Sequence, residues 1–339
     1  MLKSLLHFFG VRLVWPFYGG VGSILALHRV APEPLRSRLK ANRALEITPE
    51  DLDAMLILLR RRKYDFITMD EVPVRLRTAR RRFVVFTLDD GYRDNLDHAL
   101  PVFRRHGVPF MVNITRSFTE HAESVWWFAL EQLICSRERL VVRHEGREEQ
   151  LPLATSADRE HAFGVLATWL RSCQFDERRA LLGAMFDSSD IDPMNATRVL
   201  MMDTAGVREL SRDPLVTIGA HALHHLTSNI LTESALRVEF SASKKWLETL
   251  IGHPVKHLAY PFGGKNAVGP REFQMARECG YNTAVTTRFG NLFREHARML
   301  HQLPRLEISG NYRAVDFTER AVSGLLPAMR NRWRKIVRE

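Results

Sequence analysis

Two adjacent carboxylates, Asp89 and Asp90, follow the hydrophobic run at residues 83–86 after Thr87 and Leu88, and Gly91 comes directly after them. The apolar run predicts a buried strand of a parallel sheet, and the glycine permits a sharp turn out of it. Proteins of the α/β class place their chemistry at the carboxyl ends of such strands. Two neighbouring carboxylates repel each other there unless one binds a metal ion or they share a proton. Taken alone, the segment would equally suit a solvated Asp-Asp-Gly turn.

A pair of histidines follows a second predicted core strand, residues 215–219. His221 and His225 are four positions apart, so a helical turn or a compact loop can aim both imidazoles at one point. Such a pair alone is often a surface coincidence. With Asp90 it forms a three-ligand set for a catalytic Zn²⁺ or a similar divalent ion, which leaves positions open for water and substrate. Asp89 is then available as a general base, and His224 is interpreted as a structural or rim residue.

The elements that position these groups alternate along the chain. The alternation of strand and helix signals predicts a parallel sheet with helices outside it. About seven strands favour a closed or nearly closed barrel over an open sheet. Residues from about 120 to 210 break this alternation, are rich in helix signals and are predicted to be an insertion. Trp126 and Trp127 are expected in its core, and stacking on sugar rings is the alternative. The strands are expected at residues 23–28, 66–69, 83–86, 110–114, 215–219, 257–260, 283–286 and 303–308, and helices at 49–59, 95–106 and 232–252.

The motifs resemble those of a known family. The segment Thr87-Leu88-Asp89-Asp90-Gly91, followed by His221-x-x-x-His225, is similar to the signatures of the polysaccharide deacetylases of carbohydrate esterase family four. A third signature matches at Ala259-Tyr260-Pro261-Phe262-Gly263, and the order and spacing agree over roughly residues 20 to 310. The resemblance implies a distorted (β/α)₇ barrel with a helical insertion, and metal-dependent removal of an N-linked acyl group from a sugar.

The resemblance also implies roles for single residues. Asp89 would be the base, and the metal ligands would be Asp90, His221 and His225, holding Zn²⁺ or, alternatively, Co²⁺ or Ni²⁺. The loop containing Tyr260, Pro261 and Phe262 would border the acyl pocket, with the Tyr260 backbone N–H as a candidate oxyanion donor.

Two positions depart from the family pattern. Many members carry an arginine that braces the base where this chain has Ala259, and Arg305 from the last strand is the predicted substitute. Many members also supply the general acid from a late Leu-x-His motif, of which no clean copy exists here. His301, just before the last strand, and His28, after the first, are the remaining candidates for the acid.

The composition and net charge limit the class of partner that the chain is expected to bind. The formal net charge of +10 favours an anionic partner, but no zinc finger, RNP-type segment or long basic tail predicts a nucleic acid. The three cysteines are odd in number and widely spaced, which favours a reducing compartment over a disulfide framework.

The two ends of the chain are basic and amphipathic. Residues 1–20 begin like a signal peptide, but Arg12 interrupts the apolar run and no cleavage site is evident. Trp15, Phe17 and Tyr18 suit a membrane surface, as does the basic tail predicted at residues 311–339; ordinary packing and solvated ends are the alternative. We therefore expect a cytoplasmic protein with peripheral contact to the inner membrane.

The predicted function is that of a metal-dependent carbohydrate N-deacetylase. Its substrate would be an amino sugar of a surface polysaccharide or of the lipid-linked precursor. The alternatives are a deformylase or other linear-amide hydrolase of the same fold, and a non-catalytic glycan-binding protein.

Overall fold

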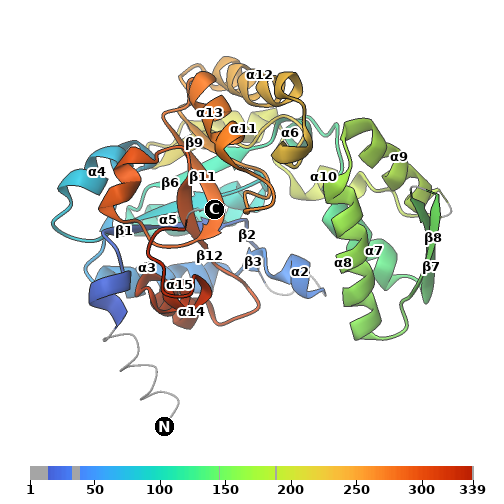
Figure 1. Ribbon diagram of the computed structural model, residues 1–339, viewed down its shortest axis with the longest axis horizontal. Coiled ribbons are helices and arrows are strands. Elements are labelled where there is room, and N and C mark those ends of the chain that lie inside the picture. Colours follow the sequence, from blue (N-terminus) through green and yellow to red (C-terminus); the bar gives the residue numbers. More distant parts are fainter. Residues whose placement is uncertain (1–13, 33–38, 145, 188, 338–339) are drawn as a thin grey trace, which may run out of the picture.

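A closed barrel of seven parallel strands forms the centre of the computed structural model, which describes residues 14–32, 39–144, 146–187 and 189–337 (Figure 1). β1 pairs with both β5 and β12 and thereby closes the ring, which confirms the predicted distorted (β/α)₇ barrel. Around the ring the strands are β1 (Gly22–Leu27), β5 (Phe83–Leu88), β6 (Phe110–Ile114), β9 (Val216–Ala220), β10 (His257–Ala259), β11 (Thr283–Phe289) and β12 (Leu303–Glu307).

The register of β1 and β5 brings two predicted site residues together. Leu27 pairs with Leu88, and the Asp89 N–H donates to the Leu27 carbonyl oxygen at 3.0 Å. Every residue of both strands is buried, as expected of a parallel barrel covered by helices. His28 and Asp89 therefore leave neighbouring strands at the same rim.

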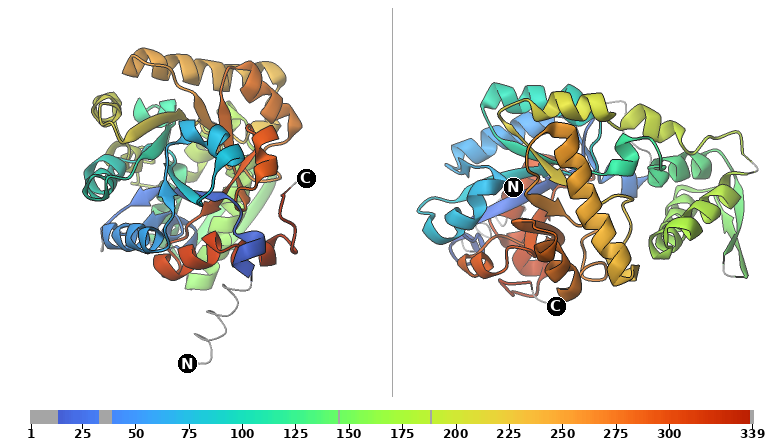
Figure 2. Two further views of the ribbon diagram at one scale, coloured as in Figure 1. Left: turned by 90° about the vertical axis from the view of Figure 1, so that its left-hand side faces the viewer. Right: turned by 90° about the horizontal axis from the view of Figure 1, so that it is seen from above.

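Helices cover the outside of the barrel (Figures 1 and 2). α3 (Pro49–Arg61) begins where predicted, because the Thr48 side chain accepts from the Asp51 N–H. α12 (Glu233–Ile251) is capped by Thr232 in the same way and ends at Gly252, which has φ 79°. The other helices of the barrel are α4 (Val72–Thr78), η2 (Asn95–Ala99) running into α5 (Leu100–His106), α6 (Arg116–Thr119), α11 (Thr204–Ser211), α13 (Pro270–Glu278), α14 (Ala314–Val322) and α15 (Leu325–Arg330).

The remaining elements are short and lie in the connections. They are β2 (Arg29–Val30), α2 (Lys40–Arg43), β3 (Glu46–Ile47), β4 (Asp65–Phe66), η1 (Met69–Glu71), η3 (Ser228–Ile230) and η4 (Arg294–Arg298). The strand predicted at residues 66–69 is therefore shorter than expected, because β4 ends at Phe66. It stops because Glu71 accepts from the Thr68 N–H and hydroxyl, which starts a 3₁₀ turn instead.

The part of the chain from α7 to α10, between β6 and β9, forms a lobe beside the barrel (Figure 1). Trp126 and Trp127 are buried in the hydrophobic core of this lobe, as predicted. One part differs from the helix-rich expectation, because residues 139–144 and 147–152 pair as antiparallel strands. Leu140 and Val142 are buried there while Val141 is exposed, which is the period-two pattern of a strand. The elements are α7 (Trp126–Cys135), β7 (Arg139–His144), β8 (Arg147–Pro152), α8 (Ser156–Ser172), α9 (Phe175–Phe186) and α10 (Asn195–Leu200).

The two ends of the described chain meet. The Tyr18 hydroxyl donates to the Trp333 carbonyl oxygen at 3.1 Å, and the two rings pack edge to face with centroids 5.5 Å apart. The predicted amphipathic segment 1–20 lies mostly outside the described residues, and of its described part Trp15 and Phe17 are exposed. No helix in the described ranges is long and apolar enough to cross a membrane.

Candidate active site

A buried ion pair holds Asp89 at the end of β5. Arg305 of β12 donates to both Asp89 carboxylate oxygens, at 2.8 and 2.6 Å, and the Asn113 side-chain amide donates a third bond at 2.8 Å. Burial favours the neutral acid, but Arg305 and the nearby His221 outweigh it, and the pKa of Asp89 lies well below its usual value. Asp89 is therefore an ionised carboxylate at neutral pH. The predicted replacement of the missing family arginine by Arg305 is consistent with this geometry.

The three candidate metal ligands converge on one point. Asp90 Oδ1 lies 3.3 Å from His221 Nε2 and 3.3 Å from His225 Nε2. This oxygen is buried, and no hydrogen bond to it is found within the described ranges. A buried carboxylate oxygen facing two imidazole nitrogens without bonding to either fits a shared ion between them. The residues present thus suit a divalent metal with a two-histidine, one-carboxylate ligand set.

The local backbone aims these ligands. Asp90 has φ 76° and Gly91 φ 86°, so the chain turns sharply as soon as β5 ends. After β9 the chain forms a compact loop rather than a helical turn, with Ala222 at φ 61° and His225 at φ 51°.

The tautomer of one ligand follows from its neighbour. His221 Nδ1 lies 2.7 Å from the Ala259 carbonyl oxygen, which can only accept, so Nδ1 carries the proton and Nε2 presents its lone pair. Burial lowers the pKa of His225 to about 4, which leaves that imidazole neutral at physiological pH. Neutral imidazole is the form that binds metals.

These side chains open into a cavity of about 240 Å³ at the carboxyl-terminal rim of the barrel. Barrel and lobe both contribute to its lining, so it is a cleft between them. From the barrel come His28, Asp89, Asp90, His221, His225, Tyr260, Phe262, Thr287 and Glu307, and from the lobe Trp126, Trp127, Phe163 and Arg171.

Comparison with known proteins identifies the fold. A family model described as polysaccharide deacetylase matches residues 176–284. The deacetylase PplD of Streptococcus pyogenes, solved with acetate, has a TM-score of 0.55 at 16% identity, covering 91% of this chain and 97% of that one. IcaB from Ammonifex degensii gives the same score and identity, covering 91% of this chain and 98% of its own. No curated protein sequence matches the chain.

The chain carries the polysaccharide deacetylase fold. The resemblance predicted from the three motifs is thereby confirmed. The family match includes His221, His225 and the third motif, whereas Asp89, Asp90 and Arg305 lie outside the matched residues. Their place in the site rests on the motif at residues 87–91 and on the geometry described above.

Within this deacetylase fold, Tyr260 does not have the expected role. Its backbone N–H donates to the Val285 carbonyl oxygen at 3.2 Å, because it continues the ladder between β10 and β11. That N–H is therefore unavailable to an oxyanion. Pro261 has no N–H to offer. Phe262 has one, and no acceptor for it is found in the described chain. Phe262 has φ 59°, lines the cavity and packs against His225 with ring centroids 4.7 Å apart.

His301 is also not where a general acid is needed. It precedes β12, at the amino-terminal end of the barrel, and does not line the cavity. Its Nε2 lies 2.8 Å from the Tyr281 carbonyl oxygen, just before β11. His28 is at the correct rim and lines the cavity with both aspartates.

Several supporting residues carry no sequence signal. Arg178 of the lobe donates to the carbonyl oxygens of His224 and His225, at 2.7 and 3.0 Å. Glu239 of α12 accepts from the Leu223 and His224 N–H groups and faces His224 Nδ1 at 2.6 Å, so His224 is structural. These contacts bind backbone groups of the histidine loop from distant elements, and no local spacing predicts them.

Proposed function

We propose that the chain is a metal-dependent hydrolase that removes an N-acyl group, first of all N-acetyl, from an amino sugar. The observation that carries this proposal is the division of labour between neighbouring carboxylates. Asp90 faces two imidazole nitrogens, while Asp89 is held ionised by Arg305 beside them. A single cavity thus offers a ligand set and a separate base within reach of each other.

The protein groups can each serve one part of amide hydrolysis. A divalent ion held by Asp90, His221 and His225, for which we favour Zn²⁺, supplies Lewis acidity toward the acyl carbonyl and the attacking water. Asp89 accepts the proton of that water as its oxygen attacks the carbonyl carbon. The Phe262 N–H, for which no acceptor is found in the described residues, is our candidate donor to the negative oxygen that develops. His28 is our candidate to protonate the leaving amine, since it lines the same cavity.

The substrate class is proposed from the relatives and the surface. PplD and IcaB support a carbohydrate amide, and the cleft between barrel and lobe has room for a sugar. We further propose peripheral contact with the cytoplasmic face of the inner membrane, where a lipid-linked precursor would be met. Phe17, Met329 and Trp333 are exposed, and the Tyr18–Trp333 contact brings the two ends of the described chain together.

The test is hydrolysis by the purified chain loaded with Zn²⁺, Co²⁺ or Ni²⁺. N-acetylglucosamine oligomers and monomeric derivatives serve as substrates, and released acetate and free amine are both measured. Asp89→Asn should retain about one metal per chain and lose turnover, whereas Asp187→Asn, an exposed acid remote from the cavity lining, should behave as wild type. Release of formate only from N-formyl sugars would favour the deformylase. Glycan binding without hydrolysis, whichever metal is added, would favour the non-catalytic glycan-binding protein.

A further inference from the structure

A second cavity adjoins the catalytic one. It has a volume of about 470 Å³ and shares two lining residues, Thr287 and Glu307, with the catalytic cavity. One side is built by β11 and the loop after β10, and the other by the segment that follows α15. Thr287 and Glu307 line both, so the two cavities lie next to each other.

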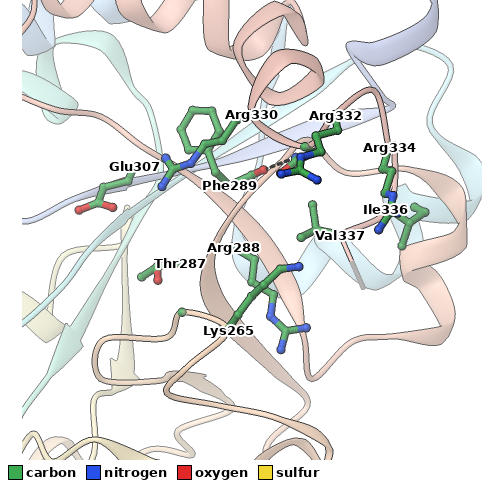
Figure 3. Close-up of a pocket in the computed structure, with 12 residues that line it drawn as sticks. Lys265, Thr287, Arg288, Phe289, Glu307, Arg330, Arg332, Arg334, Ile336 and Val337 are labelled. Atoms are coloured by element: carbon green, nitrogen blue, oxygen red, sulfur yellow. Dashed lines mark hydrogen bonds between the residues drawn. The ribbon is translucent and has the colours of Figure 1, made fainter. Parts of the chain in front are cut away.

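The charges that line this cavity are almost all positive. Glu307 is the single acid among its described lining residues, and it stands at the boundary with the catalytic cavity. The cations are Lys265, Arg288, Arg330, Arg332 and Arg334, drawn together in Figure 3. So many like charges around one hollow repel one another, and an anion placed among them relieves that repulsion.

Arg330, Arg332 and Arg334 lie at the end of α15 and in the folded segment that follows it. Arg330 reaches across the ring of Phe289, with its guanidinium carbon 4.9 Å from the ring centroid, toward Glu307 (Figure 3). The Asn331 side chain donates to the Phe289 carbonyl oxygen at 2.7 Å and so fixes the segment on β11.

The next two residues reverse the chain. Arg332 and Trp333 have φ 50° and 63°, and the Trp333 N–H donates back to the Ala328 carbonyl oxygen at 2.7 Å. Tyr18 holds the reversed segment from the other end of the chain. The guanidinium groups are therefore presented by a fixed backbone, which lowers the entropic cost of binding a ligand.

We propose that this second cavity binds a phosphate or diphosphate group carried by the amino-sugar substrate. Guanidinium groups recognise phosphate oxygens through paired, charge-assisted hydrogen bonds. The sugar's amide would then lie in the catalytic cavity and its phosphate among the arginines, on the two sides of Thr287 and Glu307. This inference rests on the proposed deacylase function for the sugar, but the anion site itself can be measured without turnover.

The first experiment measures binding of inorganic pyrophosphate to the full-length, metal-loaded chain by calorimetry. The variant Arg330→Gln/Arg332→Gln should bind it about tenfold more weakly, since two charge-assisted contacts are lost. The control Arg80→Gln/Arg212→Gln removes the same net charge from exposed positions outside both cavities, and should stay within about twofold of wild type. Pyrophosphate held only by the metal would bind equally to both variants and would overturn the proposal.

The second experiment compares N-acetylglucosamine 1-phosphate with N-acetylglucosamine as substrates. The ratio of their kcat/KM values should favour the phosphorylated sugar in the wild type and fall about tenfold in Arg330→Gln/Arg332→Gln, through KM. A ratio unchanged by the variant would overturn the assignment. If neither sugar is hydrolysed but pyrophosphate binding falls as stated, the deacylase proposal fails and the anion site stands.

A third arm separates a phosphate of the substrate from a lipid headgroup. Phosphatidylglycerol vesicles are sedimented with the wild type and with both double variants. Loss of vesicle binding only in Arg330→Gln/Arg332→Gln, with pyrophosphate binding intact, would assign these arginines to a lipid surface and overturn the proposal. Vesicle binding that persists in Arg330→Gln/Arg332→Gln, together with weaker pyrophosphate binding by that variant, would support the proposal.

Discussion

Arg305 and Asp89, 216 residues apart in the sequence, form a two-hydrogen-bond ion pair inside the barrel. β1 lies between β12 and β5, so the arginine side chain crosses one strand to reach the carboxylate. Both side chains are almost wholly removed from solvent, with exposed fractions of 0% and 2%. Neither partner can be removed without leaving the other as an uncompensated buried charge.

Replacing Arg305 should therefore reduce both stability and activity. We expect Arg305→Met to destabilise the chain by roughly 3–5 kcal/mol, the usual cost of breaking a buried pair, measured by urea denaturation. Arg305→Lys keeps the charge but loses the paired geometry. Because Arg305 holds the pKa of Asp89 low, the acid limb of the kcat/KM profile should move to higher pH in the lysine variant.

A second-site change tests whether Arg305 replaces the family arginine. Ala259 is buried at the corresponding position of the third motif. The double variant Ala259→Arg/Arg305→Ala should recover part of the activity that Arg305→Ala loses. Activity no better than that of Arg305→Ala alone would show that position 259 cannot brace Asp89 in this barrel.

Metal removal should separate the ligands from the base. Treatment with a chelator should abolish turnover, and added Zn²⁺, Co²⁺ or Ni²⁺ should restore it. Asp90→Asn and His225→Ala should lower metal content measured by atomic emission, while His301→Ala should keep both metal and activity. Loss of activity in His301→Ala without loss of folding would contradict the placement of that residue away from the site.

Gly219 is predicted to matter through Asn113. A methyl group at Gly219 would overlap the Asn113 side-chain oxygen, and Asn113 donates to Asp89. Gly219→Ala should therefore cost about 1–3 kcal/mol of unfolding free energy and lower kcat. Gly164→Ala is the matched control, because nothing lies within 4 Å of the added carbon and the helix should gain up to about 1 kcal/mol.

His28 should behave as a general acid toward the leaving amine. His28→Gln should lower kcat for N-acetyl sugars about 10²-fold or more while metal content stays unchanged. An anilide substrate, whose leaving amine needs less protonation, should lose much less activity, and equal losses on both substrates would argue against the role.

Stability should fall in acid because of His296. Burial lowers the pKa of His296 from 6.5 to about 4. Between these values the unfolded chain binds a proton that the folded chain does not, so stability is lost as the pH falls from 6.5 through 4, by up to about 3 kcal/mol. The substitution His296→Asn keeps an acceptor for the Phe293 N–H. It should flatten this part of the pH dependence in thermal unfolding, and an unchanged slope would refute the assignment.

The chemistry-bearing residues could be predicted because each follows an apolar strand. The barrel brings every such strand end to one rim, so Asp89, Asp90, His221 and His225 had to meet. Predictions failed where the outcome depends on pairing register or on a tertiary partner. The Tyr260 N–H is taken by the β10–β11 ladder, which a motif cannot reveal.

The contacts that support the histidine loop could not be predicted from the sequence for the same reason. Glu239 and Arg178 bond to backbone groups of the histidine loop, and any buried acid or arginine at those positions looks alike in sequence. The hairpin of β7 and β8 was overlooked because its alternation is short and lies among helices.

The contact of Arg178 with the His224 and His225 carbonyl oxygens also limits how the lobe can be exchanged. The lobe lies between β6 and β9 in the sequence, but one of its guanidinium groups braces the loop that carries the candidate metal ligands His221 and His225. A chimera that takes its lobe from another protein of this fold would change the lining of the cleft and lose this brace at the same time. Grafting substrate preference onto this barrel therefore requires a donor lobe that carries its own arginine to the histidine loop.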